Sequence, residues 1–347
     1  MEPAFQKHQG ARLWWFEEGR CPLYLAPMAG FTDRIFREIC KELGADVMVT
    51  EFVMANKFLD PRGERDAWEI VDFTPQQRPM GVQIFGGEPD KMAEAADRIA
   101  DRLKPDFIDI NYGCPAPKVV NNCAGSSLLR EPGLLQEIAG AVVNRVSDRL
   151  PVTAKIRIGW DEQSINATEI ARRLEDSGVE AIAIHGRTKM QGYSGEADWN
   201  VINAVAEAVS VPVVGNGSVR SAADVARVMR GGKVRGLMIG RAALGNPWIF
   251  REIKHALATG EELPPPTMEE RWSVMIRYCE ELLEHRNRAD GDKINWMRSR
   301  LKTFAREFAG SKALRRDLET VATLDELKSI RDRHLVGADP ATPAASH

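Results

Sequence analysis

The strongest constraint on the fold is an alternation of short apolar runs and helical segments, repeated eight times between residues 23 and 241. The segments between the runs have apolar residues at helical spacing, and several end on a glycine that suits a helix C-cap. Eight such units predict a (β/α)8 TIM barrel, which is an α/β fold. A doubly wound parallel sheet is the alternative, weakened because no GxGxxG motif follows the first run. The runs are 23–27, 46–51, 80–86, 107–113, 152–159, 181–187, 211–217 and 236–241.

A separate helical part is expected after the barrel. Three consecutive prolines at 264–266 cannot continue a helix and favour an extended linker. Beyond them, apolar residues recur at helical spacing almost to the C-terminus. The predicted divisions are an exposed N-terminal extension (1–20), the barrel (21–258), a proline-rich linker (259–267), a small helical domain (268–335) and a disordered tail (336–347).

Composition narrows the class of protein. No run of 18 apolar residues is present, so we expect no membrane-spanning helix and no membrane partner. The five cysteines are odd in number and widely scattered, which predicts free thiols in a reducing cytoplasm and no zinc or other metal site. We expect a cytoplasmic monomer.

Charge is distributed unevenly along the chain. The formal net charge is −3, but residues 285–316 contain ten lysines and arginines against three acids. Such an excess of positive charge favours binding of a polyanion such as RNA, although runs of charged residues are also common on solvated helix faces. The basic residues are Arg286, Arg288, Lys293, Arg298, Arg300, Lys302, Arg306, Lys312, Arg315 and Arg316.

Polar residues collect where the predicted strands end. A TIM barrel forms its active site at the C-terminal ends of its strands, so these residues should share one mouth. The last two ends are rich in glycine, whose bare N–H groups can bind a phosphate, with Arg241 adding charge. The strand-end residues are Pro27, Met28, Ala29, Gly30, Glu51, Gln83, Asn111, Lys155, Arg157, His185, Asn216, Gly217, Gly240 and Arg241.

Three side chains at this mouth suggest specific chemistry. Lys155 could form a Schiff base, place a positive charge beside a flavin ring, or pair with a carboxylate inside the barrel. Gln83 favours the flavin, because an amide can both donate to and accept from the pyrimidine edge of that ring. Cys114 lies between a glycine and a proline just after a strand, where a thiol can act as a general acid; a structural cysteine is the alternative.

The motifs "LAPMAGFTD", "VQIFG", "DINYGCPAPKVVNNCAGSSLL", "AKIRIGWD", "IHGRT", "GNGSV" and "IGRAALGNPWIF" together resemble the tRNA-dihydrouridine synthases, especially their bacterial B-type branch. The resemblance implies FMN as cofactor, NADPH as reductant and a uridine of tRNA as substrate. Hydride would reach uracil C6 from FMN, and Cys114 would give a proton to C5. Residues implied to hold FMN are Pro27, Met28, Ala29, Gln83, Lys155, His185, Asn216, Gly217, Ser218, Gly240 and Arg241. Ser218 departs from the aspartate that many members have there.

Substrate contacts follow from the same resemblance and from charge. Asn111 and Arg157 would lie near the target base, and Lys118 near RNA phosphate. Arg298 and Lys302 would bind phosphate, and Trp296 would stack on a base or belong to the helical core. The uridine must be turned out of its stack to reach a barrel mouth. Three alternatives remain: a small-molecule C=C reductase of the dihydroorotate-dehydrogenase type, a Schiff-base lyase, and a non-catalytic RNA-binding barrel.

Overall fold

The structure is a computed structural model that describes residues 12–284, 290–305 and 311–336. The described residues form two compact units: those up to residue 34 with 45–240, and residues 35–44 with those from 241 onward. This division differs from the predicted domains in two places. The first unit ends at Gly240 rather than at residue 258, and the second unit takes up the segment 35–44.

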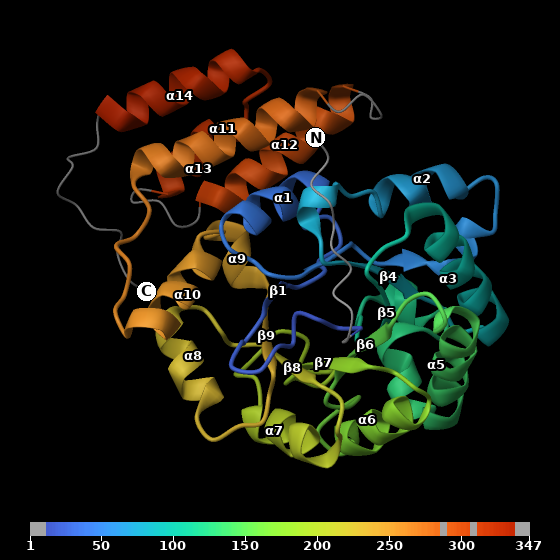
Figure 1. Cartoon of the computed structure of the whole chain (residues 1–347). Coiled ribbons are helices and arrows are strands. Elements are labelled where there is room, and N and C mark those ends of the chain that lie inside the picture. The colour runs from blue at the N-terminus through green and yellow to red at the C-terminus, as the bar shows by residue number, and fades with distance from the viewer. Residues whose placement is uncertain (1–11, 285–289, 306–310, 337–347) are drawn as a thin grey trace, which may run out of the picture. The chain divides into compact units, whose positions relative to one another are not determined.

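The first unit is a closed parallel barrel (Figure 1). Its strands follow one another around the ring, and Tyr24 of β1 pairs with Val47 next to β2 to close it. The TIM barrel is therefore confirmed, and the doubly wound sheet is wrong because it leaves two open edges. The strands are β1 (Leu23–Leu25), β2 (Met48–Val49), β3 (Val53–Met54), β4 (Met80–Phe85), β5 (Phe107–Tyr112), β6 (Val152–Arg157), β7 (Ala181–His185), β8 (Val213–Asn216) and β9 (Gly236–Ile239).

All eight predicted runs contain a strand, and β3 is an additional two-residue strand that pairs with β4. All eight strands are shorter than the runs that predicted them, because the last residues of each run leave the sheet and enter the loops at the mouth. β2 pairs with the first residues of β4 and β3 pairs with its last ones, so β3 extends the sheet on one side of that mouth.

Helices cover the outside of the barrel with their apolar faces inward (Figure 1). In α3, for example, Met92, Ala95 and Ile99 are fully buried at helical spacing. The outer helices are α2 (Glu64–Ile70), α3 (Pro89–Leu103), α5 (Pro132–Val146), α6 (Ala167–Asp176), α7 (Trp199–Ala208) and α8 (Ala222–Met229). The short helix α4 (Pro117–Val120) lies in the loop after β5. In the described part of this unit, three 3₁₀ helices accompany these helices: η1 (Ala55–Phe58), η2 (Pro75–Gln77) and η3 (Gly125–Arg130).

The segment before β1 packs into the barrel. Leu13 and Trp15 are only 9% and 4% exposed. The Trp15 indole donates a 2.5 Å hydrogen bond to the Tyr24 hydroxyl, and its ring centroid lies 5.4 Å from that of Phe107, the first residue of β5. The prediction of an exposed extension is therefore wrong for these residues, which close the barrel at the end opposite the mouth. The first 11 residues of the predicted extension lie outside the described residues. So do residues 337–347 of the predicted tail (336–347), whose first residue, Val336, ends the helix α14.

The second unit is helical. In it, Arg277 bonds both carboxylate oxygens of Glu42, and the Phe36 ring lies 6.0 Å from the Phe304 ring. Residues 261–267, which include the three prolines, form neither helix nor strand. None of the described helices is long and apolar enough to cross a membrane. The helices are α1 (Arg34–Glu42), α9 (Arg241–Gly245), α10 (Ile249–Thr259), α11 (Met268–Glu284), α12 (Asp290–Phe304), α13 (Ser311–Asp317) and α14 (Leu324–Val336).

Candidate active site

The parallel register brings most of the predicted strand-end residues to one mouth. Asn111 lies opposite Lys155 on the neighbouring strand, Arg157 lies opposite His185, and His185 lies opposite Asn216. All five are near the C-terminal ends of their strands, where a TIM barrel builds its catalytic site.

A chain of hydrogen bonds crosses the inside of the barrel below this mouth. Gln83 is fully buried; its Nε2 donates to Asp109 Oδ2 at 2.5 Å, and its Oε1 accepts from Asn111 Nδ2 at 2.8 Å. Asp109 Oδ1 also accepts from the Thr153 hydroxyl at 2.5 Å. These bonds fix which way the Gln83 amide faces.

Asp109 is a site residue that the sequence pattern did not single out. Its only signal is a carboxylate at the centre of the apolar run "FIDIN". Burial raises the pKa of Asp109, although the hydrogen bonds from Thr153 and Gln83 act in the opposite direction.

Asn111 also shapes the loop that carries Cys114. Its Oδ1 accepts hydrogen bonds from the backbone N–H groups of Gly113, at 3.0 Å, and of Cys114, at 2.8 Å. Such a side-chain turn fixes the backbone directly after the strand. The thiol of Cys114 is thereby held at the mouth by the residue that also orients Gln83.

The Cys114 side chain is 8% exposed and packs with Phe85, Val119 and Ala124. Burial raises the pKa of its thiol, while positive charge on Arg157 and Lys155 opposes the rise. The thiol is therefore protonated at neutral pH. A thiol that keeps its proton beside two cations suits a proton donor, because the cations stabilise the thiolate left behind.

Arg157 joins two loops at the mouth. Its Nε donates to Gly113 O at 2.8 Å, and its Nη1 donates to Thr188 O at 2.8 Å and to Gly192 O at 2.9 Å. Only 2% of this residue is exposed. These bonds tie the loop after β5 to the loop after β7, and contact with substrate stays a prediction.

Lys155 is a desolvated cation beside Asn216. Its Nζ donates to Asn216 Oδ1 at 3.3 Å, and Asn216 Nδ2 donates to Met238 O at 2.7 Å. Burial and the nearby Arg157 lower the pKa of Lys155 to about 8. The amine is therefore still mostly charged at neutral pH, but it loses its proton far more readily than a lysine in water.

Glycine backbone lines the mouth at the ends of β8 and β9. Gly217 has φ +116°, and an added Cβ would lie 2.8 Å from the Ala197 Cβ and 2.9 Å from His185 Cδ2. A side chain is excluded there. At Gly240 the nearest atoms to an added Cβ would be Ala26 Cβ at 3.7 Å and Met28 Sδ at 3.8 Å. Met28 follows β1 with Pro27, which is buried, and Ala29, which is exposed.

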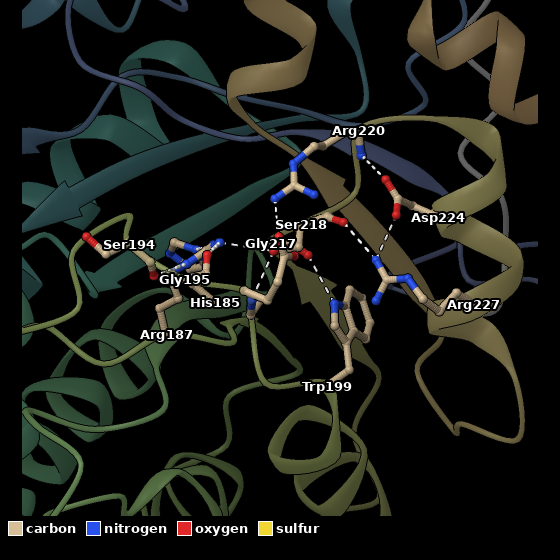
Figure 2. A network of polar contacts seen from close by, with 12 residues as sticks. His185, Arg187, Ser194, Gly195, Trp199, Gly217, Ser218, Arg220, Asp224 and Arg227 are labelled. Atoms are coloured by element: carbon tan, nitrogen blue, oxygen red, sulfur yellow. Dashed lines mark hydrogen bonds and ion pairs between the residues drawn. The ribbon is translucent and has the colours of Figure 1, made fainter. Parts of the chain in front are cut away.

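Arg187 organises the histidine side of the mouth (Figure 2). It is 1% exposed and donates to Ser194 O at 3.1 Å, to Gly195 O at 2.5 Å and to the Ser218 hydroxyl at 3.0 Å. Its Nη1 also lies 3.1 Å from His185 Nε2. A guanidinium can only donate, so His185 Nε2 accepts and the ring proton is on Nδ1. Sequence analysis missed this residue, whose signal is its place in the "IHGRT" motif.

Ser218 is engaged by its protein neighbours (Figure 2). Its hydroxyl oxygen accepts from Arg187 and from Ala197 N at 2.9 Å, and a hydrogen bond between Ser218 and Glu196 helps to lower the pKa of that carboxyl to about 2. The Ser218 side chain therefore stabilises the loop between β7 and α7, and its contact with a cofactor stays a prediction.

Two further predicted contact residues, Lys118 and Arg241, follow strand ends of the barrel. Lys118 is exposed on α4, four residues after Cys114. Arg241 is the first residue of α9 and directly follows Gly240. Among the described residues, no group of three or more His, Cys, Asp or Glu side chains could hold a metal ion.

In the helical unit, two predicted phosphate contacts already have protein partners. Arg298 donates to Val321 O at 2.8 Å and to Thr320 O at 3.2 Å, and Lys302 forms a 3.1 Å ion pair with Glu319. Trp296 donates to the Tyr278 hydroxyl at 3.0 Å, which is consistent with the predicted core position. Three basic residues of the segment lie outside the described residues: Arg286, Arg288 and Arg306.

Comparison with known proteins decides the family. The family model described as dihydrouridine synthase matches residues 24–337. This chain belongs to the dihydrouridine synthase family. It is an oxidoreductase, as the motifs predicted. It is 46% identical over 260 residues to tRNA-dihydrouridine synthase B of Pseudomonas aeruginosa, covering 75% of this chain and 77% of that one. With the enzyme of the same name from Xanthomonas axonopodis pv. citri, identity is 40% over 328 residues, covering 93% and 96%.

Solved structures share the fold of this dihydrouridine synthase. Histamine dehydrogenase from Rhizobium sp. 4-9 superposes with a TM-score of 0.52 at 14% identity, over 74% of this chain and 48% of that one. A complex of 2-naphthoyl-CoA reductase with 2-naphthoyl-CoA gives 0.53 at 12% identity, over 67% and 50%. The chain thus spans about half the length of these two proteins.

Proposed function

We propose that this chain reduces a uridine of tRNA to 5,6-dihydrouridine, with FMN as its cofactor and NADPH as the reductant. Family membership supports the reaction class, and the names of the two relatives described above support tRNA as the substrate. The observation that carries the proposal is the position of Cys114. Asn111 holds the loop of this protonated thiol at the mouth, next to the strand that carries Lys155.

The donor set at the mouth fits a flavin mononucleotide. Gln83 supplies an amide of fixed orientation and Lys155 supplies a desolvated positive charge, which together suit the polar edge of a flavin ring. Gly217 and Gly240 offer backbone without side chains at the strand ends where TIM barrels bind phosphate. When bound and reduced by NADPH, FMN supplies the hydride that uracil C6 accepts.

Other residues complete the cofactor site in this proposal. Pro27, Met28 and Ala29 would help to hold the flavin ring. His185, with its proton on Nδ1, and Asn216 contact the ribityl and phosphate part. Ser218 and Arg241 would also contact the ribityl and phosphate part of FMN.

Cys114 completes the reduction by giving a proton to uracil C5. The S–H bond breaks, a C5–H bond forms, and the pair of electrons left on sulfur makes a thiolate. Positive charge on Lys155 and Arg157 stabilises that thiolate until solvent returns its proton. Asn111 and Arg157 are proposed to lie beside the base, and Lys118, Arg298 and Lys302 beside RNA phosphates. Five free thiols are consistent with work in the cytoplasm.

The test is a map of dihydrouridine across the tRNAs of a strain deleted for this protein and then complemented with it. Particular positions should lose the modification on deletion and regain it on complementation, and the purified protein should show flavin absorbance. A colourless protein would contradict the cofactor. A flavoprotein that leaves the map unchanged and does not bind tRNA would be a small-molecule C=C reductase instead. A protein that binds tRNA without modifying it would be a non-catalytic RNA-binding barrel.

A further inference from the structure

Loops that follow β5, β6 and β7 bring cationic and aromatic side chains together beside the mouth. We define the rim patch as Arg130, Trp160, Lys189, Met190 and Tyr193. The loops after β6 and β7 are tied by backbone hydrogen bonds from Lys189 N to Gly159 O and from Met190 N to Trp160 O, both at 2.9 Å. The backbone that carries most of the rim patch is therefore held in a fixed arrangement.

Two cations lie over the Trp160 ring. The guanidinium carbon of Arg130 is 3.8 Å from a ring centroid of Trp160, and Lys189 Nζ is 4.3 Å from it. Such contacts hold long side chains in place near the aromatic face. An ordered guanidinium and ammonium can bind a phosphate with a smaller loss of side-chain entropy than mobile ones.

Large apolar side chains are exposed next to these cations. Met190 is 62% exposed and Tyr193 is 54% exposed. The Tyr193 ring lies 5.7 Å from the Arg157 guanidinium carbon and 6.2 Å from the His185 ring, so it borders the site itself. An exposed aromatic ring at that place suits stacking by a nucleotide base.

Charge near the rim patch is mixed. The exposed acids Glu131 and Glu162 follow Arg130 and Trp160 in the chain. The charge here is therefore less one-sided than in the basic segment 285–316. Base stacking with a few fixed phosphate contacts fits this surface better than binding by bulk charge.

We propose that the rim patch is a second contact surface for the substrate RNA, on the barrel itself. This inference rests on the proposed function, because it assigns the surface to the same tRNA. Tyr193 stacks on a base next to the uridine that enters the mouth, and Arg130 and Lys189 contact the phosphates that flank it. Met190 extends the apolar surface beside Tyr193.

The experiment measures tRNA affinity at several salt concentrations for Tyr193→Ala, Tyr193→Phe and Lys189→Ala. Tyr193→Ala should weaken binding about tenfold, whereas Tyr193→Phe keeps the ring and should stay within about twofold of wild type. Lys189→Ala should lower the slope of log affinity against log salt by about one, as expected for a lost phosphate contact. Arg172→Ala is the matched control, because Arg172 is an exposed cation on the outer helix α6.

The outcomes separate this inference from the proposed function. If the wild-type protein forms dihydrouridine but Tyr193→Ala and Lys189→Ala bind tRNA as it does, the rim patch is not an RNA surface. If the wild-type protein neither binds tRNA nor forms dihydrouridine, both proposals fail. If the wild-type protein dimerises in sedimentation and Met190→Ala or Tyr193→Ala abolishes the dimer, the rim patch belongs to a second copy of the chain.

Discussion

At the scale of residues, Asn111 connects cofactor chemistry with acid catalysis. One amide orients Gln83 through its nitrogen and holds the Cys114 loop through its oxygen. The strand–loop junction in "DINYGCP" is therefore fixed by the amide of Asn111, while the Cys114 side chain packs against Phe85, Val119 and Ala124.

Replacing Cys114 with serine tests its role as the acid. A serine hydroxyl fills nearly the same volume but gives up its proton far less readily than a thiol. We expect Cys114→Ser to keep its flavin absorbance while uridine reduction falls by a factor of about 10² to 10⁴, the usual contribution of a general acid. Single-turnover assays with reduced enzyme and tRNA measure this step. A variant as fast as wild type would rule out the thiol as the proton donor.

The charge of Lys155 predicts a pH dependence. Its folded-state pKa is lowered to about 8, so the positive charge is present below that pH and is lost as the pH rises through it. We expect the rate of uridine reduction to fall above about pH 8. Lys155→Arg should move the fall to higher pH, because guanidinium keeps its proton. Rates measured from pH 6 to pH 10 test this, and an identical fall in the arginine variant would assign it to another group.

At the scale of elements, the segment before β1 completes the barrel. Trp15 closes the lower end through its contacts with Tyr24 and Phe107. Trp15→Ala should lower the free energy of unfolding by about 3–5 kcal/mol, the usual cost of truncating a buried tryptophan. Urea denaturation measures it, with Glu18→Ala, an exposed position in the same segment, as the control. Equal stability of the two variants would show that the barrel closes without this segment.

Gly217, in the turn after β8, must be a glycine for two reasons: its positive φ angle and the lack of room for a Cβ. Gly231 shares only the first of these reasons, so it serves as the control. Gly217 has a positive φ and no room for a Cβ, whereas Gly231 has φ +68° and nothing within 4 Å of an added Cβ. Gly231→Ala should cost about 1 kcal/mol through backbone strain alone. Gly217→Ala should lose clearly more stability and also its flavin, which thermal unfolding and absorbance measure. An equal loss of stability in the two variants would mean that the residues around Gly217 can move to accommodate a Cβ without destabilising the fold.

Sequence patterns predict this fold well where burial is periodic and poorly where single contacts decide. The eight strands could be predicted because strands buried on both faces are continuous and apolar. The buried position of Trp15 could not be predicted, because no periodicity marks a short segment that packs by a few aromatic contacts. Within the site, strand-end positions such as Lys155 follow from topology. The bonds that engage Arg157 and Arg187 depend on loop conformations, which residue types alone do not specify.

At the scale of the whole molecule, the chain has two kinds of candidate RNA surface. The rim patch offers ordered cations and rings, whereas the helical unit offers charge. Some of that charge is already used, because Arg298 bonds backbone carbonyls and Lys302 pairs with Glu319. Lys312 and Arg316 of α13 are exposed and are better placed to bind phosphate.

Reversing these two charges tests the helical unit as an RNA surface. Lys312→Glu combined with Arg316→Glu should weaken tRNA binding at low salt by at least tenfold and lower the salt slope by about two, one for each lost phosphate contact. Arg298→Ala should instead act mainly on folding, because it leaves the carbonyls of Val321 and Thr320 without their donor. Filter binding over a salt series and thermal unfolding of the same proteins separate the two effects. Unchanged binding by the doubly reversed variant would leave α13 outside the interface, and the rim patch would then have to carry the recognition of tRNA with the residues of the mouth.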